Sequence, residues 1–476
     1  MKKKLQILWQ EAGGLKDLLT VAVPMVISTI AWTIQHFVDR MFLTWYSAES
    51  IAAAMPAGIL HFNLVCIFLG IAGYVNVFIA QYHGAGEYGK FGAIIWQGIY
   101  ISAMSAVFMF LVYPFSEDIF RTIGHAQEII PHEVIYFKIL SLATFPMAFS
   151  SAASGFFSGQ GKTIIIMVIN LAATGVNVVL DYLMIFGKFG FPEMGIKGAA
   201  IATSAAFLFS ALVYAYCLFK KENNRQFNTV SDFKFNASLF RQLLKFGLPN
   251  GLQMFIEVAG FSFFVMVVGR LGKIELVASN IALNINNLIF MPLLGISMSV
   301  SILTGQFLGE NNPHLAEKVT RRGYQLAYVY IFPYLVVFLF FPDLIIRFFN
   351  IDTTAGDFAQ VYRFLIVIMR FTAIYSWFDV LNLVLAGCLK GAGDTNYVMK
   401  IISVASVFVM IIPNWIFIAI LRLHLFWGWS FISAYVAILG ISFYLRFRSG
   451  KWKEKRVIYR ENRFLPEYPD IPAAEI

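Results

Sequence analysis

The sequence is poor in charge, in cysteine and in catalytic motifs. Only 13% of its 476 residues are charged, whereas soluble domains carry roughly 25%. Its three cysteines, Cys66, Cys217 and Cys388, lie far apart in apolar stretches without a CxxC pair, which predicts neither a disulfide framework nor a structural metal site. The seven histidines form no HExxH motif. We therefore expect no enzyme, no soluble domain and no cofactor.

Hydrophobic side chains dominate the sequence instead. They make up 59% of the chain, aromatic residues contribute 17%, and the mean hydropathy is +0.71. Apolar runs of about 20 residues or more recur along the whole length, enough for helices that cross a hydrocarbon core ~30 Å thick. This composition predicts an all-α integral membrane protein embedded in the lipid bilayer.

We expect twelve transmembrane helices in two six-helix bundles. The spans are predicted at residues 18–45, 52–81, 92–114, 132–158, 163–187, 196–219, 243–270, 276–306, 322–343, 361–388, 396–420 and 425–447. They divide the chain into an N-terminal segment (1–17), a first bundle (18–219), a linker (220–242), a second bundle (243–447) and a tail (448–476). Some prolines lie deeper within spans, where they can kink a helix or only make its packing irregular: Pro56, Pro146, Pro292 and Pro413.

The net charge of +9 is concentrated in segments that we expect in the cytoplasm. Basic residues gather at the N-terminus, in the linker, in the tail and in the loops after spans two, four, eight and ten. The loop residues are Lys90, Lys162, Lys318, Arg321, Arg322 and Lys390. Since Lys and Arg concentrate in cytoplasmic loops, both termini are predicted on the cytoplasmic side of the cell membrane. The basic residues form no stripe interleaved with aromatics, so nucleic-acid binding is not expected.

The two halves of the chain are repeats of one another. Adding 225 residues converts Leu18, Leu19, Pro24, Gln81 and Gly84 into the same residue types at 243, 244, 249, 306 and 309. A turn of the form G-x-x-x-G-x-G-x-T occurs at 155–163 and again at 387–395. Six spans per half give both copies the same orientation, an arrangement typical of transporters with substrate sites at the repeat interface. The alternative is a duplication that serves stability alone.

The glycine turn at 155–163 superficially resembles the end of a phosphate-binding loop. Phe156 stands where that loop needs glycine, and the turn joins two membrane helices rather than a strand and a helix. We expect both turns to be tight hairpins in which glycine caps the end of a helix.

Four carboxylates stand out within predicted spans, because each lies on a helical face with other polar side chains. These stripes are Gln35 and Asp39; Thr174, Asn177 and Asp181; Asn250, Gln253 and Glu257; and Tyr375, Asp379 and Asn382. A further stripe in span eight consists of Asn280, Asn284 and Asn287. A carboxylate at the bilayer centre costs roughly 2.5–3.5 kcal/mol, so it usually faces an interior cavity and works there. The alternatives are a residue in the headgroup layer or an interhelical hydrogen bond.

Buried carboxyls of this kind can act as a switch for a coupling ion. A proton neutralises such a group, and Na⁺ does so where neighbouring oxygens help to bind it. An organic cation would compete for the same negative site. The residues therefore predict antiport of an organic cation against Na⁺ or H⁺, without choosing between the two ions.

The chain resembles the multidrug and toxic compound extrusion (MATE) family. The resemblance rests on the twelve spans, the repeat, the paired glycine turns and the Gln-x-x-Gly after spans two and eight together. The resemblance covers residues 15–447 and implies a V-shaped pair of bundles around a central cavity that exports cationic or amphipathic drugs. It implies a cation site in the second bundle at Glu257, Asp379 and Tyr375, and a coupling site in the first bundle at Asp39, Asn177 and Asp181. Polar residues expected to line the cavity are Gln35, Gln253, Asn280, Asn284 and Asn287.

The two halves depart from exact repetition at the first-bundle site. Asn177 has a counterpart in Asn414, but Ile418 stands where Asp181 would map, which predicts that the halves differ in function. Two rival functions remain open. A flippase for lipid-linked saccharides shares the fold but would favour a cationic cavity for a pyrophosphate headgroup, and a polytopic membrane enzyme would need a catalytic cluster. Nothing in the sequence requires more than a monomer.

Overall fold

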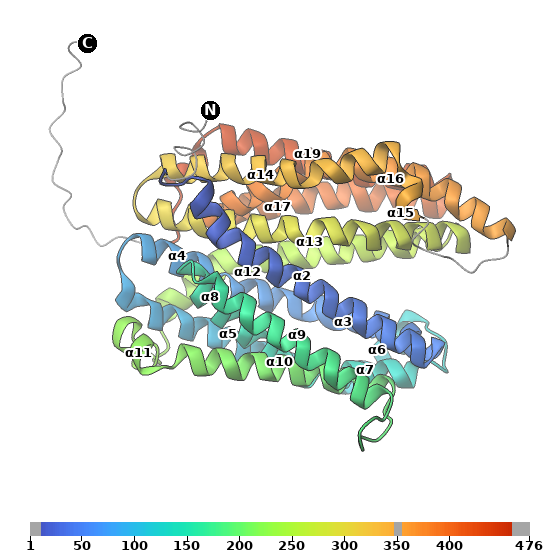
Figure 1. Ribbon diagram of the computed structural model, residues 1–476, viewed down its shortest axis with the longest axis horizontal. Coiled ribbons are helices and arrows are strands. Elements are labelled where there is room, and N and C mark those ends of the chain that lie inside the picture. The colour runs from blue at the N-terminus through green and yellow to red at the C-terminus, as the bar shows by residue number, and fades with distance from the viewer. Residues whose placement is uncertain (1–10, 347–354, 459–476) are drawn as a thin grey trace, which may run out of the picture.

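The structure is a computed structural model that describes residues 11–346 and 355–458. Every regular element in these ranges is a helix (Figure 1). The first half contains α2 (Leu15–Tyr46), α3 (Ala48–Gly73), α4 (Val75–Gly84), α5 (Phe91–Val112), α6 (Ser116–Ile123), α7 (Ile130–Leu142), α8 (Thr144–Gly159), α9 (Thr163–Ile185), α10 (Ile196–Leu218) and α11 (Lys221–Phe227). The second half contains α12 (Ala237–Val268), α13 (Lys273–Gly309), α14 (Pro313–Phe340), α15 (Pro342–Ile346), α16 (Ala355–Ala392), α17 (Thr395–Ala405), α18 (Ile412–Asn414) and α19 (Leu425–Arg448).

The predicted set of twelve membrane-spanning helices is confirmed. Eleven helical stretches among the described residues are long and apolar enough to cross a bilayer, and a twelfth span is the bent pair α7 and α8. The bend of 45° falls at Ala143, three residues before Pro146. Proline has no N–H to donate to the carbonyl four residues earlier, which explains why the helix breaks there. Around Pro413 the span is wound as π-helical turns, at Ser406–Ile411 and Trp415–Ile420.

Several predicted span boundaries are wrong by four or more residues, and two of these errors assigned to loops basic residues that lie within helices. The ninth helix begins at Pro313 rather than near 322, because Asn312 accepts a hydrogen bond from the Leu315 N–H and proline suits a first helical position. Lys318, Arg321 and Arg322 therefore lie in α14 rather than in a loop. Lys390 lies in the last turn of α16, which ends only at Ala392, before Gly393 with its φ of +94°.

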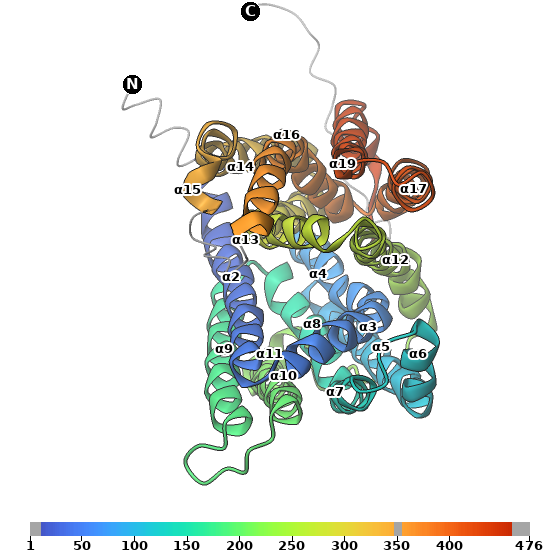
Figure 2. The ribbon, with the colours of Figure 1, turned by 90° about the vertical axis from the view of Figure 1, so that its right-hand side faces the viewer.

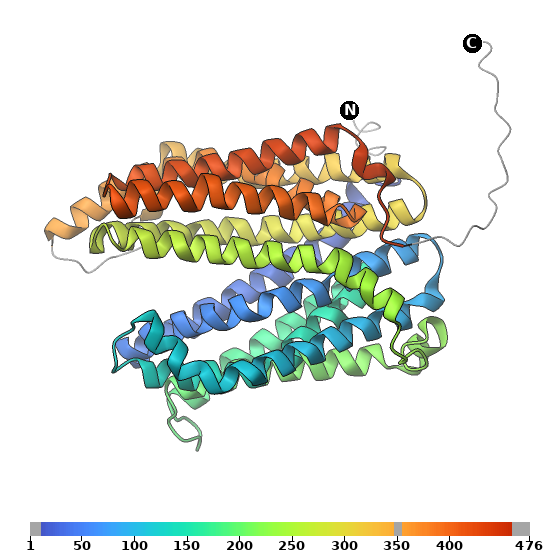
Figure 3. The same ribbon diagram turned by 180° about the vertical axis from the view of Figure 1, so that it is seen from behind.

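The helices form two groups, here called the N-bundle (α2–α10) and the C-bundle (α12–α19), which lie one above the other in Figures 1 and 3. Two helices are shared between them. Leu18, Val21 and Ala22 of α2 belong to the apolar core of the C-bundle, whereas Leu243 of α12 belongs to the core of the N-bundle. In the end-on view of Figure 2, α2 lies at the left edge and α12 at the right edge of the boundary between the groups.

The bundles meet closely at the end of the molecule where α4, α8, α13 and α16 finish, called here the terminal end (left in Figure 1). Gln81 donates from Nε2 to the Gly391 carbonyl at 2.9 Å, and the repeat-equivalent Gln306 donates to the Gly159 carbonyl at 2.8 Å. Neither Gly84 nor Gly309 has room for a side chain. A Cβ on Gly84 would lie 1.9 Å from the Gln306 carbonyl oxygen, and one on Gly309 would lie 2.1 Å from that of Gln81.

The outer surface of both bundles is apolar, as a membrane requires. Large side chains such as Phe110, Val329 and Tyr216 are at least 70% exposed on helices rather than buried in a core. Such side chains are suited to contact with lipid tails, since lipid is as apolar as a protein interior.

Candidate functional site

The predicted first-bundle residues come together between α2 and α9. Asp39, Asn177 and Asp181 are all buried, and Asn177 and Asp181 are 0% exposed. The Asp39 and Asp181 carboxyls lie close enough to interact with each other and with the Asn177 amide. Within the described residues, neither carboxyl oxygen of Asp181 has a conventional hydrogen-bond donor. The result is a compact group of oxygens with too few donors to satisfy them, the kind of site that suits a hard cation or a shared proton.

Two residues of this group were missed in the sequence. Thr203 of α10 accepts a hydrogen bond of 3.4 Å from the Asn177 amide through its Oγ1. The Tyr136 ring of α7 lies near both carboxyls and is largely buried. Neither is charged, and each lies on a helix without a carboxylate stripe, so helical spacing held no signal that could have found them.

Arg40 adds a positive charge beside this group. Its side chain is exposed and points to the other bundle, with Nη1 3.5 Å from the Asn284 Oδ1 of α13. Asn280, Asn284 and Asn287 are all exposed, and the Asn284 amide also donates to the Asn280 carbonyl at 2.9 Å. This predicted stripe therefore has at least one member that faces α2. Gln35, one turn before Asp39, is instead buried, and its Nε2 has no partner in the described chain.

The predicted second-bundle residues also come together, between α12 and α16. Glu257 of α12 and Asp379 of α16 are close enough to interact electrostatically, and Tyr375 lies beside Asp379. Each carboxylate has an amide donor one turn away on its own helix. Gln253 Nε2 lies 3.4 Å from Glu257 Oε1, and Asn382 Nδ2 lies 2.9 Å from Asp379 Oδ1.

This second group also contains residues that the sequence did not indicate. The Tyr435 ring of α19 lies near both carboxylates, and its hydroxyl accepts a hydrogen bond of 3.3 Å from Ser406. Lys390 is close enough to Glu257 to interact with its charge. Lys390 was missed because it was predicted to lie in a loop. In the structure it lies on α16, three helical turns after Asp379 and on the same helical face.

The acidic groups are too small to form a dedicated metal cage. No set of three or more His, Cys, Asp or Glu side chains in the described ranges is arranged to hold a metal ion. Each group instead combines two carboxyls with amides and hydroxyls.

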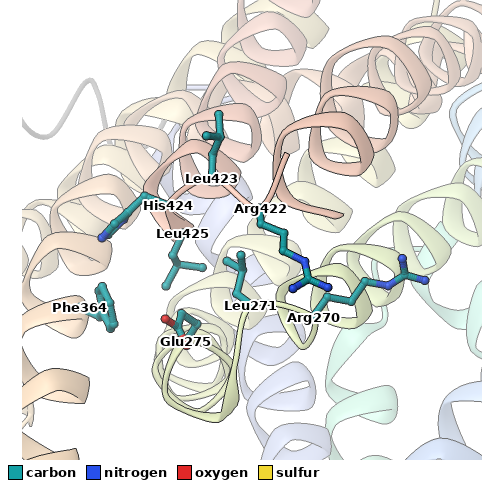
Figure 4. Close-up of a pocket in the computed structure, with 8 residues that line it drawn as sticks. All are labelled: Arg270, Leu271, Glu275, Phe364, Arg422, Leu423, His424 and Leu425. Carbon is teal, nitrogen blue, oxygen red and sulfur yellow. The ribbon is translucent and has the colours of Figure 1, made fainter. Parts of the chain in front are cut away.

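A pocket of about 300 Å³ lies at the opposite end of the C-bundle from the terminal end (Figure 4). Its lining residues are Arg270, Leu271, Glu275, Phe364, Arg422, Leu423, His424 and Leu425. The Arg270 guanidinium also lies over the Trp415 ring, 4.7 Å from its centre. The pocket includes none of the residues predicted from the sequence and is separate from both acidic groups.

Comparison with known proteins identifies the family. A sequence model of the MatE family matches residues 24–183 and 249–416, two segments whose starts are 225 residues apart as in the repeat. The chain belongs to the MatE family. MatE relatives include a probable multidrug resistance protein NorM of Thermotoga maritima, 25% identical over 94% of this chain and 95% of that protein. Another is the multidrug resistance protein PmpM of Pseudomonas aeruginosa, 26% identical over 81% of this chain and 80% of that protein.

Solved structures agree on the fold of this MatE protein. A MOP superfamily transporter from Pyrococcus furiosus superposes with a TM-score of 0.83 over 94% of this chain and 97% of its own, at 20% identity. A MATE transporter in a straight conformation superposes with a TM-score of 0.82 over 94% and 98%, at 21% identity. The protein is therefore a multi-pass membrane transporter of the multidrug efflux family and not an enzyme.

Proposed function

We propose that this transporter exports cationic or amphipathic organic compounds in exchange for Na⁺ or H⁺. The observation that carries the proposal is the Asp39–Asp181 pair inside the N-bundle. Like charges and the loss of water both raise the free energy of two neighbouring carboxylates in an apolar bundle. A bound Na⁺ or proton relieves both costs, so the pair is suited to hold a coupling ion.

The position of the pair explains how an ion can act on the whole molecule. Asp39 lies in the second half of α2, which packs on α9, while the first half of α2 packs on α13 of the C-bundle. Neutralising the pair changes the free energy of the contact between α2 and α9. Because α2 is shared, that change also biases the position of one bundle relative to the other.

The second acidic group supports cationic cargo. Glu257 and Asp379 lie close together with Tyr375 and Tyr435, so negative charge is combined with aromatic rings. Organic cations are attracted both by carboxylates and by the faces of aromatic rings. Glu257 lies on α12, the second shared helix, so cargo bound here can compete with the effect of the coupling ion.

The charge distribution supports an orientation with both termini in the cytoplasm. The described parts of the linker and of the tail lie at the terminal end (Figure 1). The segments after α4 and α8 and the start of α14, which carry Lys90, Lys162 and Lys318, lie there too. Positive charge of this kind favours the cytoplasmic face. We propose a monomer, because each bundle contains a complete acidic group of its own.

The test is efflux of a fluorescent organic cation from proteoliposomes, driven by a Na⁺ gradient alone and then by a pH gradient alone. We expect one gradient to drive efflux, and Asp181→Asn to slow that efflux at least about tenfold, a loss of ~1.4 kcal/mol. Glu257→Gln and Asp379→Asn should slow it similarly. Asp118→Asn, the same change at an exposed site on α6, is the matched control. Ion-coupled efflux that is unchanged in all three acidic variants would contradict the proposal.

The flippase remains a second candidate because of Arg40. Its guanidinium is exposed opposite the Asn284 amide and is suited to a phosphate. Drug susceptibility of cells with and without the protein distinguishes the two functions. Protection against cationic dyes supports export, whereas a cell-envelope defect without any change in susceptibility supports the flippase.

A further inference from the structure

Residues that follow the last membrane helix also contribute to the packing of the molecule. After α19, residues 449–458 leave the C-bundle and run to the N-bundle beside α4, as the red segment in Figure 3 shows. Trp452 is 0% exposed and belongs to the core of the C-bundle, whereas Val457 and Ile458 belong to the core of the N-bundle. Only four residues, 453–456, therefore separate the two cores along the chain.

The start of this segment is anchored on the C-bundle. Trp452 stacks on Phe447, with ring centres 5.5 Å apart, and its Nε1 donates to the Phe447 carbonyl at 3.0 Å. Lys453 forms an ion pair of 2.5 Å with Glu317 of α14. These contacts hold the segment in place before it crosses between the bundles.

The end of the segment is held by the same glutamine that joins the bundles. Gln81 of α4 donates to the Gly391 carbonyl through Nε2 and accepts the Val457 N–H through Oε1 at 2.9 Å. The two bonds use both ends of one buried amide, whose exposure is 0%. The Val457 side chain also lies against the turn after α16, since a Cβ on Gly393 would be 2.8 Å from it.

Comparison of the two repeats shows that the bond from Val457 to Gln81 is added to a contact that both repeats make. Gln306, the equivalent of Gln81, bonds to the Gly159 carbonyl, the equivalent of Gly391. No tail segment of the described chain is bonded to the Gln306 side chain. The molecule thus has two equivalent glutamine contacts between its bundles, and the tail reinforces one of them.

We propose that residues 449–458 form a strap that stabilises the state in which the bundles are closed at the terminal end. Alternating access requires the bundles to separate at that end, and a strap that is held in both cores opposes this separation. The strap sets the fraction of molecules open at the terminal end. A pocket of about 290 Å³ beside it, lined by Leu308, Gly309, Asn311, Glu454, Arg456 and Ile458, leaves the strap reachable from the terminal end.

The role of the strap in transport rests on the proposed function, but its test does not need transport. Ile164 and Asn396 are exposed equivalents at the first turns of α9 and α17, both at the terminal end. Spin labels on cysteines at these two sites, in a chain whose three natural cysteines are replaced, report the separation of the bundles by pulsed electron paramagnetic resonance. We expect Val457→Asp to add a longer-distance population that is absent from the parent protein.

One matched control and a second pair of variants make the result decisive. Ser449→Asp puts the same charge at an exposed position of the same segment and should leave the distances unchanged. Gln81→Ala should add more of the longer-distance population than Gln306→Ala, because only Gln81 also holds the strap. Gln81→Ala leaves the tail sequence intact, so it decides the matter if Val457→Asp does not fold. Equal effects of the two glutamine changes, or unaltered distances in Val457→Asp, would overturn the strap. Absence of ion-driven efflux by the parent protein would instead count against the proposed function, whatever the distances in the variants.

Discussion

At the scale of single residues, the two acidic groups differ in how their charge is compensated. In the C-bundle, Gln253 and Asn382 each donate to a carboxylate, and hydrogen bonds to the charged form stabilise it. In the N-bundle, Asp181 has no conventional donor in the described chain and faces a second carboxyl instead. We therefore expect the N-bundle group to depend more strongly on a bound cation than the C-bundle group does. The loss of the acid at Ile418, the equivalent of Asp181, fits this division of roles.

The Thr203 hydroxyl offers a test of the N-bundle group that leaves every charge in place. Thr203→Val keeps the shape of the side chain but removes an oxygen that lies beside Asn177. We expect about a fivefold weaker apparent affinity for the coupling ion, because one polar contact contributes ~1 kcal/mol. The measurement is the ion dependence of efflux in proteoliposomes. Thr320→Val removes a buried hydroxyl of the C-bundle outside both acidic groups and should change nothing; an equal effect of both changes would refute the assignment.

At the scale of helices, the repeated motifs gain a role that their sequence alone did not indicate. The glycine turns cap helices as predicted, since Gly161 and Gly393 have φ values of +76° and +94°. Their Gly159 and Gly391 carbonyls also accept the hydrogen bonds from Gln306 and Gln81 that join the bundles. Gln-x-x-Gly and the glycine turn are thus two sides of one contact, made twice by the repeat.

Alanine at Gly84 or Gly309 tests this contact. A Cβ there would collide with the backbone of the opposite bundle, so we expect the bundles to shift and the stability to fall by about 1–3 kcal/mol, the usual cost of overpacking. Thermal unfolding in detergent provides the measurement. Gly175→Ala is the matched control, because a Cβ at this exposed position of α9 meets nothing within 4 Å. That control should be neutral or slightly stabilising, as alanine is favoured over glycine inside helices. Equal stability of all three variants would show that the close approach is unimportant.

At the scale of the whole molecule, two bundles are joined by helices that belong to both. α2 begins in the C-bundle core and ends against α9, while α12 begins in the N-bundle core and ends in the C-bundle. Under the proposed function, a coupling ion at Asp39 and cargo at Glu257 would act on the two elements that connect the bundles. Exchange of one cation for another would then move the bundles, because neither helix can respond alone.

Membrane orientation is the whole-molecule property with the most direct test. Lys455 is exposed at the terminal end, and Phe189 is 90% exposed in the loop between α9 and α10 at the opposite end. In a background without natural cysteines, a maleimide that cannot cross the membrane should label Phe189→Cys in intact cells. The same reagent should label Lys455→Cys only after the cells are opened. The reverse pattern would place the termini outside.

The sequence by itself determined the class, the number of spans and the repeat of this protein. A membrane acts on each stretch of chain separately, so hydropathy along the chain is sufficient to find helices, and duplicated residues such as Gln81 and Gln306 are visible without a structure. Helical spacing also found Asp39, Asp181, Glu257 and Asp379. Only the tertiary structure decided which of them meet, because Asp39 and Asp181 belong to helices that are distant in sequence.

The same limit explains the residues that were missed or misplaced. Thr203, Tyr136 and Tyr435 are uncharged side chains whose importance comes from neighbours on other helices, and Lys390 was assigned to a loop that the structure shows to be helix. The crossing of the tail from Trp452 to Val457 is invisible in a segment that reads as a polar end of the chain. Its burial depends on side chains of both bundles, which come together only in the folded molecule.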